Sequence, residues 1–206
     1  MKQEWKKHEK ELYGTKEDTA LLTIPRQKYF TITGVGNPNE EDFSERVGVL
    51  YSLAYAVRMM PKSGFTPEGY NEYTVYPLEG IWECIDDTVT IDKSTLRYKI
   101  MIRQPDFVTE EVAQKAFEIT RRKKPHRLLN DVVFEELEDG LCVQILHVGT
   151  YDDEPHSFHA MKEYMLRNHL ERKTTSHREI YIMDARKSAP EKLKTILRYS
   201  VRYRIE

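Results

Sequence analysis

Hydrophobic and polar residues alternate in several short segments, and between these segments the apolar spacing changes to that of a helix. Residues 27–36 alternate and end in glycine, which predicts a strand, whereas apolar residues between 43 and 59 recur every three or four positions, which predicts a helix. Segment 72–86 is predicted as a strand or a hairpin, and segment 96–103 as a further strand. The first half of the chain therefore shows the order strand, helix, strand, strand.

A second helix is predicted from about residue 109 to the basic residues at 121–124. Thr109 is a suitable N-cap, Glu110 and Glu111 suit the positive end of the helix, and the cations suit its negative end. This explains the run RRKK without a role in nucleic-acid binding. Strands at 131–137 and 141–149 follow.

The same order then occurs again, with a helix beginning near residue 154 and strands at 178–184 and 194–203. The segments ITGVGNPNEEDF and ILHVGTYDDEPHSF both place Val-Gly at a strand end, then acidic residues, then Phe. We therefore predict an α+β fold made of two tandem βαββ repeats, at about 27–103 and 131–203, in one domain spanning 21–206. Their antiparallel sheet would carry helices on one face. The other face would be solvent-exposed, a dimer interface or a groove between the repeats.

Composition excludes several classes of protein. The 206 residues include 32 Lys and Arg against 34 Asp and Glu, a balance that argues against direct nucleic-acid binding. Cys84 and Cys142 form no CxxC pair, so a disulfide framework or a structural zinc site is not expected. Residues 1–20 form a charged extension without a signal peptide, and no apolar run could span a membrane. We expect a cytoplasmic protein with no membrane association.

The strand at 178–184 supplies the candidate chemistry. Ile180 and Ile182 point one way, while Glu179, Tyr181 and Met183 point the other. A solvated strand face would account for this pattern, and so would a ligand groove. A carboxylate beside a phenol can bind a cation, or can move a proton and donate a hydrogen bond.

Other residues are candidates for lining the same groove. Tyr76 and Trp82 share parity in the first repeat and could stack a flat ring opposite Glu179. His147 ends a strand and could be a base or a core histidine, and Tyr151 follows it closely. Glycines 34 and 36 lack the third glycine of a nucleotide-binding loop. His156 and His159 lack a third ligand at a recognisable spacing, so neither a metal nor a cofactor is expected.

The closing segment REIYIMDARKSAPEKLKTILRY resembles the GyrI-like small-molecule-binding domain family. YPLEGIWE, YKIMIRQPDFVTEE and LHVGTYDDEPHSFHAM resemble other segments of its stand-alone branch. The resemblance implies two βαββ repeats around a ligand groove, in which Glu179 would face a flat, hydrophobic and often cationic compound.

The same resemblance leaves three functions open. It implies hydrolysis of cyclopropane-containing genotoxic compounds. For this reaction we expect Glu179 to activate or orient the water and Tyr181 to donate a hydrogen bond to the developing oxyanion, or the two roles to be exchanged. The resemblance also implies a non-catalytic sink or sensor that would use the same groove. A protein-interaction module acting on DNA gyrase is the third alternative.

Overall fold

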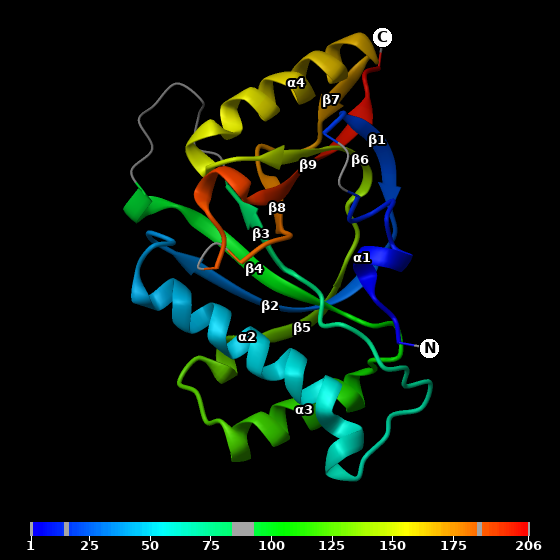
Figure 1. The fold of residues 1–206 in the computed structure, drawn as a ribbon, viewed down its shortest axis with the longest axis vertical. Helices are drawn as coiled ribbons and strands as arrows, with labels where there is room; N and C mark the ends of the chain where they lie inside the picture. The colour runs from blue at the N-terminus through cyan, green and yellow to red at the C-terminus, as the bar shows by residue number, and fades with distance from the viewer. Residues whose placement is uncertain (1, 15–16, 84–92, 185–186, 206) are drawn as a thin grey trace. The chain divides into compact units, whose positions relative to one another are not determined.

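The structure is a computed structural model that describes residues 2–14, 17–83, 93–184 and 187–205 (Figure 1). It is an α+β fold in which every described pair of strands is antiparallel. The chain forms two compact units, each assembled from separate segments. Unit 1 comprises Met1–His8, Gln27–Leu78 and Ile91–Leu137, and unit 2 comprises Glu9–Arg26, Glu79–Thr90 and Glu138–Glu206. Cys84 lies outside the described residues, and Cys142 is a buried free thiol.

Unit 1 is built on strand β2 (Gln27–Val35), which pairs with β4 (Arg97–Gln104) on one side and β5 (Val133–Leu137) on the other. Helices α2 (Glu41–Met59) and α3 (Glu110–Lys123) contact each other, and α2 contacts β2 and β4 (Figure 1). The apolar spacing at 43–59 explains this arrangement, because it places one face of α2 in the core. The smaller elements of this unit are α1 (Trp5–His8), η1 (Met60–Ser63), η2 (Lys93–Thr95) and η3 (Leu129–Asp131).

The predicted start of α3 is confirmed in detail. The Thr109 side chain accepts a hydrogen bond from the backbone N–H of Val112 at 3.3 Å, with Glu110 and Glu111 in the first turn. The basic residues predicted for the opposite end occupy the last turn of the helix. The charged ends of α3 are therefore explained by helix stability.

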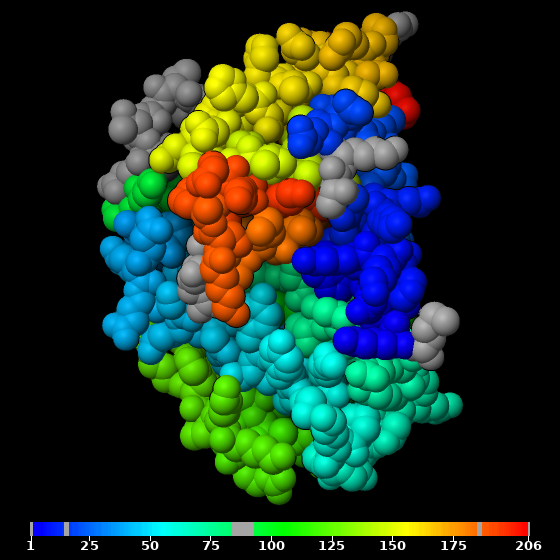
Figure 2. Space-filling view, in the orientation of Figure 1, coloured from blue at the N-terminus to red at the C-terminus, as the bar shows by residue number. Residues whose placement is uncertain are grey.

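Unit 2 has the strand order β1 (Ala20–Ile24), β6 (Gly140–Val148), β9 (Lys194–Tyr203), β8 (His177–Tyr181) and β3 (Leu78–Trp82). Strand β7 (Leu170–Arg172) pairs with the end of β9. Helix α4 (Glu154–Arg167) follows the short η4 (Tyr151–Asp153), and η5 (Pro190–Lys192) precedes β9. Met161 and Met165 of α4 enter a core with Val143, Leu197 and other residues of β6 and β9. The outer face of α4 is at the surface (Figure 2, yellow).

The two predicted repeats are visible in the backbone. β2, α2, β3 and β4 correspond in order to β6, α4, β8 and β9. The Val-Gly pairs match as well, because Gly36 and Gly149 have φ of 130° and 138°, a conformation that favours glycine. The repeats nevertheless exchange a strand, since β3 of the first repeat pairs with β8 of the second. Strand β5, within the range predicted for the second repeat, pairs with β2 of unit 1.

Two strand boundaries differ from the prediction. β3 begins only at Leu78, so Tyr76 precedes the strand. β8 ends at Tyr181, and Ile182 and Met183 form a bend. The charged N-terminal stretch is divided between the two units and is hydrogen-bonded within each of them. In unit 1, the Trp5 indole N–H donates to the Val75 carbonyl at 3.0 Å. In unit 2, the Leu12 carbonyl accepts from Arg198 at 3.3 Å.

Candidate functional site

Strand β8 presents Glu179 on the face of unit 2 that α4 covers. Glu179 pairs directly with Leu197 of β9, and side chains of directly paired residues project to the same face. Leu197 lies in the core with Met161 of α4, and Phe158 of α4 packs edge-on against His177 at 4.9 Å between ring centroids. Glu179 therefore lies on the face of the unit 2 sheet that α4 covers, whereas the sequence predicted a possible groove on the face away from the helices.

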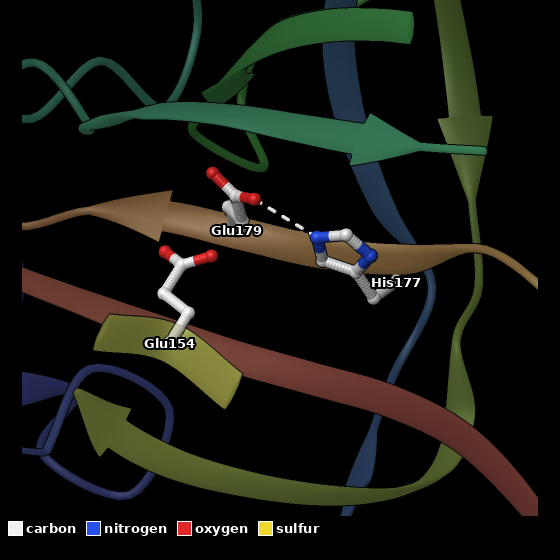
Figure 3. A group of neighbouring side chains, drawn as sticks. All are labelled: Glu154, His177 and Glu179. Carbon is white, nitrogen blue, oxygen red and sulfur yellow. Dashed lines mark hydrogen bonds and ion pairs between the residues drawn. The ribbon is translucent and has the colours of Figure 1, made fainter. Parts of the chain in front are cut away.

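Four side chains on β3 and β8 form a continuous chain of polar contacts. The Trp82 indole N–H donates to the Tyr181 oxygen at 3.0 Å, and the Tyr181 O–H donates to Oε2 of Glu179 at 2.7 Å. Nε2 of His177 lies 2.8 Å from Oε1 of Glu179 (Figure 3). Glu179 is 8% exposed. Its carboxyl group is thus oriented through both oxygens, in a site with little water.

Glu154, the first residue of α4, brings a second carboxyl group to this cluster. The candidate ligand atoms of Glu154, His177 and Glu179 all lie within 4.8 Å of one another. Figure 3 shows both carboxyl groups pointing into the same space, with the imidazole beside them. These three residues could hold a metal ion. The His156–His159 pair considered in the sequence is elsewhere, because both side chains are exposed on α4.

Burial acts strongly on the phenol groups near the carboxylates. Desolvation raises the pKa of Tyr181 well above its usual value of 10, and the charge of Glu179 raises it further. Tyr151 is 44% exposed, but desolvation of its hydroxyl group, with Glu179 and Glu154 nearby, raises its pKa to about 12. Tyr181 is therefore a neutral hydrogen-bond donor at physiological pH.

We expect alkaline pH to destabilise the fold because of these phenols. In the unfolded chain a tyrosine loses its proton near pH 10, whereas the folded protein retains it, so the unfolded state binds fewer protons above that pH. The free energy of unfolding should fall as pH rises from about 10 to 12. Urea unfolding across this range measures the effect, and Tyr181→Phe should make the fall shallower. A free energy that does not change with pH would contradict the pKa shifts.

Gly80 makes room for the contact between Trp82 and Tyr181. It pairs with Glu179 across the two strands. A Cβ atom at Gly80 would lie 2.8 Å from Nε1 of Trp82 and 3.4 Å from the Tyr181 oxygen. Even alanine at this position would push against the indole.

Gly80→Ala should therefore displace the Trp82 ring and weaken its hydrogen bond to Tyr181. The chain has two tryptophans, so an NMR spectrum gives one indole N–H signal for each. We expect the Trp82 signal to shift and the Trp5 signal, whose donor bonds to Val75, to stay in place. Gly48→Ala is the matched control, because a Cβ there meets no atom within 4 Å. An unmoved Trp82 signal in Gly80→Ala would show that the strand adjusts instead.

The other predicted ligand-binding residues have different surroundings. The ring of Tyr151 packs edge-on against Tyr181 at 6.3 Å, and Met183 is half-buried in the bend after β8. His147 is buried in unit 2, with Nδ1 3.0 Å from Ser157 Oγ and Nε2 2.8 Å from the Thr150 carbonyl. Because a carbonyl only accepts, Nε2 carries the proton, and His147 holds the turn that leads to Tyr151 and Glu154. The Tyr76 ring lies in unit 1, 4.6 Å from the Arg103 guanidinium carbon.

The opposite face of β8 carries a buried ionic network that the sequence did not indicate. Arg178 donates to Glu79 at 2.8 Å and to Asp139 at 2.7 Å. Arg198 donates to Asp139 at 3.3 Å and to Gln144 at 2.9 Å. Arg178 and Glu79 are only 5% and 1% exposed, so the Glu79 carboxylate depends on Arg178 for charge compensation.

Comparisons with known proteins agree with this fold. Crystal structures of hydrolases from Listeria innocua are 35% identical to the chain, cover 97–98% of it and 100% of their own length, and have TM-scores of 0.89 and 0.91. The EcmrR C-terminal domain is 14% identical over 91% of this chain and 98% of its own, with a TM-score of 0.54, and shows the fold alone. No protein with a curated description matches the chain significantly.

Two further findings complete the comparison. Within the described residues, no helix is long and apolar enough to cross a membrane. Residues 18–202 match the family described as the GyrI-like small molecule binding domain. This match covers nearly all of the chain and agrees with the two βαββ repeats. The chain belongs to the GyrI-like small-molecule-binding domain family.

Proposed function

We propose that this protein is a hydrolase that adds water to a strained, electrophilic ring in a flat hydrophobic compound. The observation that carries the proposal is the buried Glu179 carboxyl group, which accepts from Tyr181 and contacts His177. The 35% identity to hydrolases over 97–98% of the chain supports an enzymatic role for this group.

Glu179 is the proposed general base. Its two oxygens are each held by one neighbour, and each oxygen retains a lone pair that can accept from water. Glu179 takes a proton from the water, and the water oxygen forms a bond to a ring carbon. In a cyclopropane conjugated to a carbonyl, the ring C–C bond breaks and its electron pair moves to the carbonyl oxygen. The proton on Glu179 then neutralises that oxygen, so the net change is the addition of one water.

Tyr181 is the proposed partner of the developing oxyanion. Its single proton points at Glu179 in this structure. Once Glu179 has accepted a proton from water, it becomes a weaker acceptor, and the Tyr181 hydroxyl can turn to the substrate oxygen. The Trp82 indole N–H donates a hydrogen bond to the Tyr181 oxygen and stabilises negative charge on that oxygen.

The aromatic residues around Glu179 favour a flat substrate. Trp82 and Tyr151 both border Tyr181, and rings of this kind stack on planar compounds. Two carboxylates close to these rings also suit a substrate with a positive charge. The ligand contacts proposed for Met183 and His147 depend on how the compound lies over Glu179.

A single incubation tests the proposal. The purified protein is mixed with a duocarmycin-type compound, whose cyclopropane is conjugated to a carbonyl, and the mass of the compound is followed over time. We expect a gain of one water that is faster than in buffer alone. A compound that stays intact but raises the melting temperature would overturn hydrolysis and support a non-catalytic sink or sensor. An intact compound without a thermal shift would favour a protein-interaction role.

A further inference from the structure

We propose that Glu154, His177 and Glu179 form a binding site for a divalent transition-metal ion, with Zn²⁺ as the best match. The three ligand atoms already lie within 4.8 Å of one another, and Nε2 of His177 is 2.8 Å from Oε1 of Glu179. Zinc bonds to nitrogen and oxygen of about 2.0–2.2 Å put neighbouring ligand atoms roughly 3–4 Å apart. Small side-chain rotations would therefore bring all three atoms into coordination.

The fold places these ligands on one strand and one helix of unit 2. His177 and Glu179 are two residues apart on β8 and thus project to the same side, and Glu154 begins α4 opposite them (Figure 3). No sequence motif indicates these three ligands, because the rest of α4 separates Glu154 from His177 and Glu179 on β8. This explains why the sequence alone predicted no metal.

The charges of the cluster suit a divalent cation. Glu154 and Glu179 are 7% and 8% exposed, and the His177 side chain is 10% exposed. Two carboxylates that are close together and largely shielded from water repel each other, and a doubly charged ion between them removes that repulsion. One imidazole with two carboxylates is a donor set suited to Zn²⁺ or Mn²⁺ rather than to Ca²⁺ or Mg²⁺, which take oxygen ligands.

Neighbouring residues already hold the ligands in place. The Tyr181 O–H bonds to Oε2 of Glu179 and so leaves Oε1 directed at the cluster. The edge-on Phe158 ring limits rotation of His177. Hydrogen bonds and ring contacts of this kind behind the ligands are typical of metal sites and keep the ligands oriented. Three protein ligands would leave an open position for water or a compound, and with Oε1 of Glu179 on the ion, Oε2 would be the oxygen that acts as the proposed base.

The test is metal binding itself, so its result does not depend on the proposed hydrolysis. The full chain is freed of metal with a chelator and titrated with CoCl₂, because Co²⁺ bound by four or five ligands absorbs visible light and reports on a zinc site. We expect one Co²⁺ per chain, displaced by ZnCl₂, and a higher melting temperature with ZnCl₂. An absence of visible absorption together with an unchanged melting temperature would overturn the proposal.

Variants show where the ion binds. Glu154→Gln and His177→Gln should each weaken Co²⁺ binding by at least tenfold, and far-UV circular dichroism without metal confirms that they fold. His159→Ala is the matched control, because His159 and Glu163 form an exposed pair 3.3 Å apart on α4 that could also attract metal. Binding that is lost in His159→Ala, or retained in both cluster variants, would show an adventitious surface site and overturn the proposal.

Discussion

Glu179→Gln should lower the rate of water addition by about 100-fold or more, the range expected for losing a general base. The amide is nearly the same size as the carboxyl group, and its oxygen can still accept from Tyr181. It cannot take a proton from water, however, so the loss falls on the chemical step. The rate of mass gain of the duocarmycin-type compound, compared with that of the wild type, measures this effect.

Measuring binding of the compound to Glu179→Gln shows whether a lost rate comes from the missing base or from a misfolded protein. Glu179→Gln should still raise its melting temperature when the compound is added, because the aromatic walls are unchanged. Glu171→Gln is the control, since Glu171 forms a surface pair with Arg202 on neighbouring strands of the same unit. Full turnover by Glu179→Gln would exclude the proposed base. Equal losses in both variants would point to a general effect on the protein.

Arg178→Met should destabilise the protein by about 3–5 kcal/mol, the effect of removing one member of a buried ion pair. Methionine fills much of the same space but leaves the Glu79 carboxylate, 2.8 Å from Arg178 and almost inaccessible to water, without this partner. Asp139 also loses its shorter contact, although Arg198 remains at 3.3 Å. Urea unfolding followed by circular dichroism measures the change in free energy.

The surface pair Arg202–Glu171 again supplies the comparison. Arg202→Met removes a cation at a 2.6 Å contact between exposed side chains, and such pairs contribute only about 0–1 kcal/mol. The double variant Arg178→Met, Glu79→Gln should recover part of the loss, because it removes the uncompensated charge as well. Similar losses for Arg178→Met and Arg202→Met would show that burial of the network matters less than its geometry suggests.

The sequence predicted the elements of the fold well, because apolar spacing, helix caps and turn residues are local signals. The Thr109 cap and the two Val-Gly turns depend on a few neighbouring residues, and the structure confirms them. The pairing of β3 with β8 carried no such signal, because it joins residues about 100 positions apart.

The candidate site was predicted only in part for the same reason. Period-two alternation placed Glu179 and Tyr181 on one face, and their hydrogen bond confirms that they are neighbours. His177 shares this parity and could have been found from it. Glu154 could not, because a glutamate at the start of a helix is fully explained by the helix dipole. Arg178 looked like an ordinary charged residue until its buried acidic partners were known.

The exchange of strands between the repeats has a consequence for synthesis on the ribosome. β9 pairs with β6, β7 and β8, and it is made after all of them. Unit 1 has all its strands once residue 137 has emerged, whereas β1 and β3 must wait for partners made much later. Unit 2 should therefore acquire protease resistance only once β9 has emerged from the ribosome, and nascent chains stalled before that point should expose unpaired strand edges to chaperones.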